Sequence, residues 1–360
     1  MTALRVFLGP IEYAGVVWGY REALRSTGVK ALAVTFHHPF GYPADISLRG
    51  GRYRRNLQLT LLLPWALRTF HLFHFHGGRS LLPGGLDAPL LRAAGKKIIM
   101  QFHGCELRPR RIVQRDPLRA VNVCQHCPGG CPPDADKARL ARYWERHADA
   151  LICHPEFAYL LTRPYYHLPL GVALPPPAPW PTGGGPMVVA HAPSRRAVKG
   201  THYVLQAIAD LQREGLPVRL QLLEGLENIV VRRLLAACHI VVDQLLVGWF
   251  GVLALEAMAV GRPVICYLDD RWARLIPETA DLPIVRATPE TLKETLASLV
   301  QDPVRCQALG LAGRAYIERV YHPVRLGQAL LAIYTGTAQP CEPWRAPVRS
   351  EIGSETGAGP

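Results

Sequence analysis

The residues best suited to chemistry in this sequence gather around one glycine turn and one carboxylate. Residues 247–251 form a turn with two glycines, and residues 252–260 are rich in the Ala, Leu and Met that favour a helix. Backbone N–H groups at such a helix start form an anion site. Glu256 lies one turn into the helix, where its carboxylate can accept hydrogen bonds from vicinal hydroxyls such as those of a ribose.

Cysteine spacing indicates a second kind of site, a structural zinc ion. Cys124, Cys127 and Cys131 have metal-ligand spacing, and the glycines and prolines near them allow tight turns. Reduced free thiols or an oxidised pair fit the pattern equally well. The candidates for a fourth ligand are Cys105, His126 and Cys153.

The stretch around Glu256 also carries a resemblance to a known family. Phe250-Gly-Val-Leu-Ala-Leu-Glu-Ala-Met-Ala-Val-Gly-Arg-Pro-Val264 resembles the nucleotide-sugar signature of retaining GT-B glycosyltransferases, family four in particular. That signature has two glutamates separated by seven residues. The second falls on Glu256 and implies contact with the nucleotide ribose. The first, which holds the donor sugar in the family, falls on Gly248, so this sequence departs from the family at the donor-sugar contact.

The resemblance extends to a basic loop. His191-Ala-Pro-Ser-Arg-Arg-Ala-Val-Lys-Gly-Thr201 follows an expected strand and resembles the family's diphosphate-binding loop. Arg196 and Lys199 match its two cations, and the adjacent Arg195 is a substitute for the first. Fixed positive charge beside helix N-terminal amides suits a pyrophosphate leaving group, and GT-B enzymes use it in place of a metal ion. A surface turn with exposed cations is the competing interpretation.

A further match lies in the first half of the chain, where His103-Gly-Cys-Glu106 resembles the strand end that faces the donor in the family. Cys105 replaces the usual serine. Gly15, near the start of an expected helix over 16–26, suits a phosphate or acceptor group, although a simple strand–helix turn explains it as well. The expected catalytic residues are His103, Arg196 and Lys199. The expected donor-binding residues are Gly15, Arg195, Phe250, Gly251 and Glu256.

Charge is distributed unevenly along the chain. Residues 1–165 hold 23 lysines and arginines against 11 acidic residues, whereas the remainder holds 18 against 17, so the first half carries nearly all of the net charge of +13. A solvated arginine-rich surface explains this at least as well as an anionic partner does. Such a partner would be a lipid surface, contacted peripherally, or a lipid-phosphate acceptor. Nucleic acid is disfavoured because no recognition motif accompanies the charge.

Composition excludes several classes of protein. No run of about 18 apolar residues is present, so no membrane-spanning helix is expected. The odd count of nine cysteines, unevenly placed, argues against a secreted disulfide framework. The start of the chain runs into a strand pattern without a signal-peptide layout, and a cytoplasmic location, peripheral at the inner membrane face, is expected.

The elements that must position these residues alternate between strand and helix in both halves. Strands are expected at 4–8, 31–36, 71–75, 97–102 and 150–153, and again at 187–192, 218–223, 240–242 and 264–268. This pattern predicts an α/β GT-B architecture, with two doubly wound parallel-sheet (Rossmann-like) domains facing across a cleft. The expected boundaries are a first domain over 1–168, a Pro/Gly-rich linker over 169–186, a nucleotide-sugar domain over 187–321, a helix crossing back over 322–334, and a flexible tail over 335–360.

Three hypotheses of function follow. The first is a retaining, metal-independent hexosyltransferase in polysaccharide biosynthesis, using a UDP or GDP sugar and a glycan or lipid-linked acceptor. The second is a nucleotide-sugar-binding protein on the same scaffold, motivated by Gly248. The third, a GT-B sugar-nucleotide epimerase, needs additional cleft carboxylates for proton transfer, and only Glu106 is available.

Overall fold

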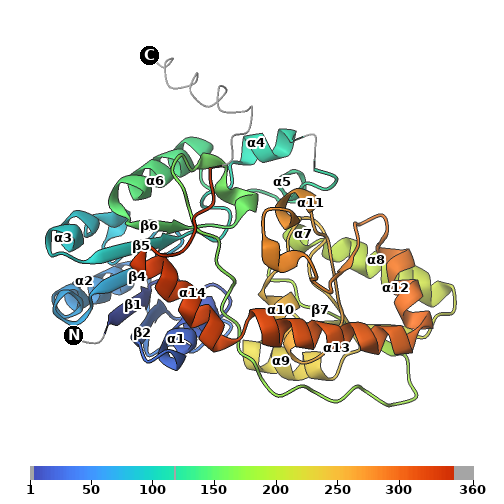
Figure 1. The fold of residues 1–360 in the computed structure, drawn as a ribbon. Coiled ribbons are helices and arrows are strands. Elements are labelled where there is room, and N and C mark those ends of the chain that lie inside the picture. The colour runs from blue at the N-terminus through green and yellow to red at the C-terminus, as the bar shows by residue number, and fades with distance from the viewer. Residues whose placement is uncertain (1–3, 117–118, 344–360) are drawn as a thin grey trace.

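Two parallel β-sheets, each accompanied by helices, make up the fold (Figure 1). The computed structural model describes residues 4–116 and 119–343. In both sheets every paired strand runs parallel to its neighbour. The two doubly wound α/β domains expected from the sequence are therefore confirmed.

The first sheet has the strand order β3-β2-β1-β4-β5-β6. The order changes direction between β1 and β4, and ligands bind beyond the carboxyl ends of strands at such a switch point. The elements of this half are β1 (Arg5–Gly9), α1 (Val16–Ser26), β2 (Lys30–Phe36), β3 (Ile46–Leu48), α2 (Arg52–Thr69), β4 (Leu72–His76), η1 (Pro83–Gly85), α3 (Ala88–Ala93), β5 (Lys97–Gln101), α4 (Arg110–Arg115), α5 (Val123–His126), α6 (Asp134–His147), β6 (Ala150–Ile152) and η2 (Pro155–Leu160).

The second sheet has the strand order β11-β10-β9-β7-β8, with its switch point between β7 and β9. Candidate site residues lie in the segments that follow β1, β7 and β9, the strands at the two switch points. The elements of this half are β7 (Met187–His191), α7 (Arg196–Lys199), α8 (Thr201–Arg213), β8 (Val218–Leu222), α9 (Asn228–Ala236), β9 (Ile240–Val242), α10 (Val252–Ala259), β10 (Val264–Cys266), α11 (Asp270–Ala273), η3 (Pro277–Thr279), β11 (Val285–Arg286), α12 (Leu292–Gln301), α13 (Pro303–Val320) and α14 (Pro323–Thr335).

The central strands are buried on both faces. Every residue of β4 and β7 is buried, as expected for parallel strands covered by helices. In the first half, the ring of Phe7 on β1 lies 5.5 Å from that of Phe73 and 6.0 Å from that of Phe75, centroid to centroid. This aromatic packing gives the strand ends above it a rigid base.

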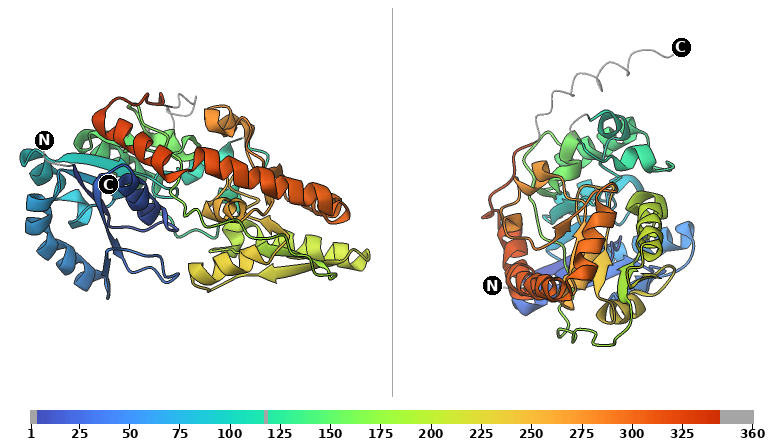
Figure 2. Two further views of the ribbon diagram at one scale, coloured as in Figure 1. Left: turned by 60° about the horizontal axis from the view of Figure 1, so that its bottom comes forward. Right: turned by 90° about the vertical axis from the view of Figure 1, so that its right-hand side faces the viewer.

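Helix α14 returns the chain to the first domain. Figures 1 and 2 show α13 running along the second domain and α14 continuing onto α1. Gly327 permits the close approach, because a Cβ atom there would lie 2.2 Å from the carbonyl oxygen of Ala23 on α1. At the end of α14, the Tyr334 hydroxyl lies 2.8 Å from Nδ1 of His74 on β4. Of the tail expected over 335–360, residues 344–360 lie outside the described residues, and Cys341 pairs with Tyr165 through their backbones.

Several elements differ from the sequence-based expectation. The sequence pattern predicts a helix over 57–69, whereas α2 begins five residues earlier, at Arg52. Its arginine-rich first turn lacks the apolar periodicity that marks a helix. The short elements β3, α11 and β11 were not expected, since segments of two to four residues carry too little pattern.

Candidate active site

Two adjoining cavities lie where the domains face each other. The larger, of about 310 Å³, is lined by Tyr13 and His103 of the first domain and by Phe250 and Gly251 of the second. The smaller, of about 140 Å³, is lined mainly by the second domain, including Lys199 and Glu256. Both cavities share the lining residues Ala14 and Val252. The structure therefore brings five of the expected site residues to one cleft: Lys199, Glu256, His103, Phe250 and Gly251.

Lys199 is held in place by two partners. Its Nζ lies 3.2 Å from Oδ1 of the fully buried Asp243 and 2.6 Å from Oε1 of Gln244. The Asp243 carboxylate also accepts a hydrogen bond from the backbone N–H of Gly251. A Cβ at position 251 would lie 3.1 Å from the Lys199 ammonium, a tight contact that only a small shift of the lysine would relieve. Asp243 and Gln244 were missed from the sequence, although their position directly after β9 at the switch point is a usable signal.

The other two expected cations are engaged elsewhere. Arg196 is exposed and forms a two-bond ion pair with Glu224. Arg195 donates to Sγ of Cys127 at 3.3 Å, across the domain boundary. Neither arginine lines the two cavities. Among the expected diphosphate contacts, Lys199 is thus the residue that the structure places in the cleft.

Glu256 lies in the smaller cavity beside an amide. Nδ2 of Asn228 donates to its Oε1 at 2.8 Å. Burial raises the pKa of Glu256 to about 7, and the Asn228 hydrogen bond opposes that rise. The Asn228 backbone N–H in turn donates to the carbonyl of Phe40 at 2.8 Å, which links the start of α9 to the first domain. A carboxylate with one occupied oxygen can still accept from a ligand hydroxyl.

His103 is neutral and built into an aromatic stack. Its ring lies 4.1 Å from that of Tyr13, and its Nε2 lies 2.9 Å from Nδ1 of the buried His76. Burial lowers the pKa of His103 to about 3. The backbone N–H of His103 donates to the Glu106 carboxylate. His103 can therefore shape the larger cavity as an uncharged group, and Glu106 is committed to the turn that follows β5.

The start of α1 near Gly15 is capped by the chain itself. Oε1 of Glu12 accepts from the N–H groups of Gly15 at 2.9 Å and Val17 at 3.3 Å. Burial raises the pKa of Glu12 to about 7, against the effect of these hydrogen bonds. The helix N-terminus expected to receive a phosphate thus already has a carboxylate acceptor. Glu12 was missed from the sequence, although it lies only three residues before Gly15.

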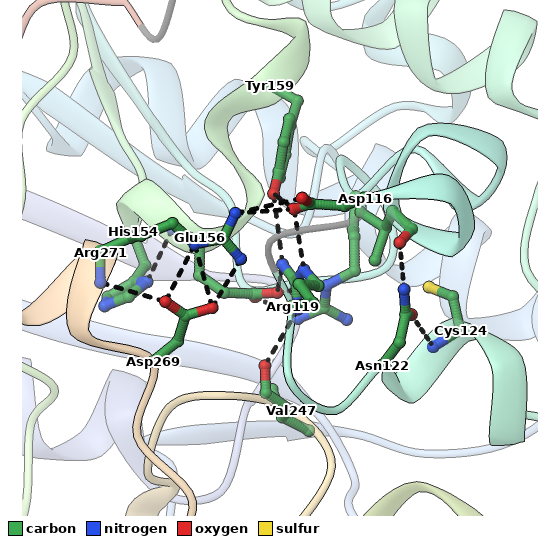
Figure 3. Close-up of polar contacts among 12 residues, drawn as sticks. Asp116, Arg119, Asn122, Cys124, His154, Glu156, Tyr159, Val247, Asp269 and Arg271 are labelled. Atoms are coloured by element: carbon green, nitrogen blue, oxygen red, sulfur yellow. Dashed lines mark hydrogen bonds and ion pairs between the residues drawn. The ribbon is translucent and has the colours of Figure 1, made fainter. Parts of the chain in front are cut away.

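A buried ionic network borders the larger cavity (Figure 3). The Glu156 carboxylate accepts from Nε of Arg108 at 2.9 Å and from Nη2 of Arg119 at 2.8 Å. Arg119 also donates to the carbonyl of Val247 at 3.3 Å, in the glycine turn of the second domain. In the same network, the Arg271 guanidinium donates to the carboxylates of both Asp116 and Asp269. The network fixes the loop after β5 against the turn before α10.

Gly248, at the position of the family's first glutamate, adopts a left-handed conformation with φ of 86°. A Cβ there would lie 3.3 Å from Cβ of Asp269, whose N–H donates to the Gly248 carbonyl at 3.0 Å. A side chain at position 248 would therefore be strained and crowded.

The expected zinc ligands were also located. Cys124 is buried, and burial raises the pKa of its thiol to about 11. Cys127 and Cys131 are partly exposed. Within the residues that the structure describes, no group of three or more His, Cys, Asp or Glu side chains is arranged to hold a metal ion. The zinc site remains a prediction.

Comparison with known proteins gives one short sequence match. No protein-family model matches the chain. A GDP-mannose-dependent monoacylated alpha-(1-6)-phosphatidylinositol monomannoside mannosyltransferase of Corynebacterium glutamicum is 32% identical over 83 residues. The match covers 23% of this chain and 22% of that protein, so about a fifth of the relative's length is represented.

The structural similarities extend over nearly the whole chain. Sucrose-phosphate synthase of Thermosynechococcus elongatus superposes with a TM-score of 0.63 at 16% identity, over 92% of this chain and 98% of that one. HepE of Anabaena, solved in complex with UDP-glucose, gives a TM-score of 0.59 at 14% identity, over 92% and 99%. Together with the two parallel sheets and the cleft between them, these similarities show that the chain has the GT-B fold.

Proposed function

We propose that the protein is a glycosyltransferase that moves a hexose from a UDP or GDP sugar to a glycan or lipid-linked acceptor, with retention of configuration and without a metal ion. The observation that carries the proposal is the convergence of Lys199 and Glu256 on one cavity, which adjoins the cavity of His103. A cation and a carboxylate that line the same cavity suit the diphosphate and the ribose of one nucleotide. Two similar proteins support it, namely the GDP-mannose-dependent mannosyltransferase and HepE, which was solved in complex with UDP-glucose.

Each residue then has a defined task. The Lys199 ammonium neutralises charge on the diphosphate as the bond between the anomeric carbon and the phosphate oxygen breaks. Glu256 accepts from the ribose hydroxyls. The neutral ring of His103, held by Tyr13 and His76, packs against the donor sugar.

The acceptor step follows from retention. In the proposed front-face mechanism, the acceptor hydroxyl oxygen bonds to the anomeric carbon on the face that the phosphate leaves. Its proton passes to the departing phosphate oxygen, so no protein carboxylate is required as a nucleophile. The products are the glycosylated acceptor and the nucleoside diphosphate.

Calorimetric titration tests the donor assignment. UDP and GDP, free and attached to hexoses, are titrated into the wild type and Lys199→Ala. We expect one nucleotide to bind and Lys199→Ala to weaken it by about 2 kcal/mol. Lys293→Ala, which removes a lysine paired with Glu214 on the surface, is the matched control and should bind like the wild type. If no nucleotide binds the wild type, the proposal is wrong.

Turnover is tested separately. Products made from the best-bound nucleotide sugar are examined by NMR, and an anomeric configuration equal to that of the donor supports retention. Nucleotide-sugar binding without transfer to any acceptor would instead favour a binding protein on the same scaffold. Activity that persists after exhaustive chelation of divalent ions supports the metal-independent mechanism.

A further inference from the structure

Helix α2 presents an apolar stripe to solvent. Tyr53, Leu57, Leu61 and Trp65 are 88%, 58%, 70% and 40% exposed, and their spacing of four places them on one face of the helix. The opposite face packs into the core through Leu59, Leu63 and Ala66. Exposed apolar residues scattered singly need no explanation, but a continuous row over three turns marks an interaction surface. We call these four residues the α2 stripe.

The segment that carries the α2 stripe is strongly cationic. Residues 46–86 contain no aspartate or glutamate. No arginine of this segment forms an ion pair with any acidic side chain that the structure describes. The arginines of this segment are Arg49, Arg52, Arg54, Arg55, Arg68 and Arg79.

Three of these arginines lie in the first turn of α2, where the helix dipole disfavours cations. Arg79 packs nearby: its Nη2 donates to Asn56, and burial together with Arg52 and Arg55 lowers its pKa. Within the described residues, no acidic side chain pairs with these arginines to offset their mutual repulsion. The arrangement becomes favourable when an external anionic surface covers it.

The far end of the α2 stripe opens onto a third cavity, of about 400 Å³. Trp65 and Phe70 line it together with Arg5 and Lys30. Nε of Arg5 is buried there without a hydrogen-bond partner. Basic groups beside exposed aromatic and aliphatic side chains form the combination that meets the headgroup region of a bilayer.

The near end of the α2 stripe lies at the edge of the sheet that carries the cleft. Asn56, beside Tyr53, accepts from Arg79, which follows the carboxyl end of β4. His76 at that same end bonds to His103 in the larger cavity. Figure 1 shows α2 on the outer side of the first domain, away from the second domain. A surface that contacts the stripe would therefore reach the first domain's rim of the cleft without blocking it.

We propose that the α2 stripe docks the protein on the surface of a bilayer that contains anionic phospholipids. The four side chains enter the boundary between headgroups and acyl chains, and the flanking arginines with Arg5 and Lys30 contact lipid phosphates. No helix among the described residues is long and apolar enough to cross a membrane. This docking does not depend on the proposed transferase activity.

Vesicle binding of the full chain tests the proposal. Vesicles of phosphatidylcholine alone are compared with vesicles that contain about one third phosphatidylglycerol, by co-sedimentation at low and high salt. We expect binding at least about tenfold stronger to the anionic vesicles, and a sharp decrease at high salt. On binding, tryptophan fluorescence should shift to shorter wavelength in the wild type, and Trp65→Phe should remove most of the shift.

The double variant Leu57→Glu/Leu61→Glu should lose at least about tenfold in vesicle affinity. Leu311→Glu is the matched control, because Leu311 is 62% exposed on α13 of the other domain, and it should bind vesicles like the wild type. Unchanged vesicle binding by the double variant overturns the proposal, as does equal binding to neutral vesicles. Concentration-dependent dimerisation of the wild type that the double variant abolishes would assign the stripe to a second copy instead.

Nucleotide titration separates this proposal from the proposed function. The double variant should keep the nucleotide affinity of the wild type, since the stripe lies outside both cleft cavities. Loss of nucleotide binding together with an altered circular dichroism spectrum would indicate misfolding. In that case the variant Arg52→Gln/Arg54→Gln, which changes only exposed side chains, replaces the Leu57→Glu/Leu61→Glu variant as the test. It should show the same loss of binding to anionic vesicles.

Discussion

The ammonium nitrogen of Lys199 lies 3.2 Å from the carboxylate of Asp243, which is fully buried. That carboxylate also receives the backbone N–H of Gly251. One anion therefore holds both the cation of the loop after β7 and the turn that starts α10. The position of the Lys199 charge is fixed before any ligand arrives, which lowers the cost of ordering it on binding.

Replacing Asp243 should destabilise the protein. In Asp243→Asn a single amide oxygen replaces a charged group that serves two donors, and we expect the free energy of unfolding to fall by about 2 kcal/mol. Urea denaturation at pH 7 measures the change. Asp210→Asn, at a surface site that pairs with Arg213, is the control and should change stability by less than about 0.5 kcal/mol. Equal changes in the two variants would contradict the assigned role of Asp243.

Nucleotide affinity should depend on the protonation of Glu256. Burial raises its pKa from 4.5 to about 7. Because protonation removes an acceptor for the ribose hydroxyls, affinity should decrease by up to about tenfold from pH 8 to pH 6. Calorimetry at the two pH values measures this, and Glu256→Gln should flatten the dependence. Glu12→Gln, which removes another carboxyl with a pKa of about 7, should keep the slope. If the pH dependence of nucleotide affinity vanished in Glu12→Gln, that dependence would be due to Glu12 and not to Glu256.

The raised pKa of Glu256 affects the stability of the ligand-free protein with the opposite pH dependence. A folded-state pKa above the unfolded value means that the protonated form of Glu256 favours folding. Its contribution to stability is fully present below pH 4.5 and is lost as the pH rises through about 7. Glu256→Gln should therefore be more stable than the wild type at pH 8 and similar to it near pH 4. Thermal unfolding at both pH values provides the measurement, and a variant less stable at pH 8 would oppose the expectation.

Neutralising Glu156 should have a large effect. Arg108 and Arg119 are both buried against its carboxylate, and Glu156→Gln would leave two guanidinium groups without their counterion. We expect a loss of about 3–5 kcal/mol in the free energy of unfolding. Glu224→Gln breaks the surface ion pair with Arg196, and because water solvates both groups there, it should lower the free energy of unfolding far less. If urea denaturation gave similar losses of stability for Glu156→Gln and Glu224→Gln, burial of the Glu156 network would add nothing to the free energy of unfolding.

Position 248 should tolerate no side chain. A residue with Cβ in the left-handed conformation costs about 1–2 kcal/mol, and at Gly248 the contact with Asp269 adds crowding. Gly28→Ala is the control, because Gly28 has φ of 85° with no atom within 4 Å of the added Cβ. Gly248→Ala should therefore lower stability more than Gly28→Ala does. Gly248→Glu should be destabilised as well, and improved donor binding by this variant would contradict the structural assignment.

The fold was predictable because its signals are local. Buried β-branched runs followed by helical patterns indicated the parallel sheets, and the glycine turn with Glu256 marked the cleft side of the second domain. Lys199 was predicted from the resemblance of its basic loop, which precedes a helix, to the family's diphosphate-binding loop. These residues owe their positions to the strand or helix beside them, and a pattern within about ten residues contains that information.

The partners of these residues could not be predicted, since they come from distant parts of the chain. Asp243 lies 44 residues from Lys199. Asn228 and Glu256 are 28 residues apart. Arg196 matched the family pattern, yet its charge pairs with Glu224, also 28 residues away. Such pairings depend on how the strands and helices are assembled, and charge alone does not select between available acceptors.

The return of α14 to the first domain has a consequence for synthesis of the chain. Leu326, Leu330 and Tyr334 belong to the same buried cluster as Val17 and Tyr20 of α1. A chain emerging from the ribosome therefore exposes the apolar face of α1 until nearly the last described residues have been translated. The first domain is therefore completed only after the second has been translated, and until then the apolar residues that α14 covers remain open to aggregation or chaperone binding.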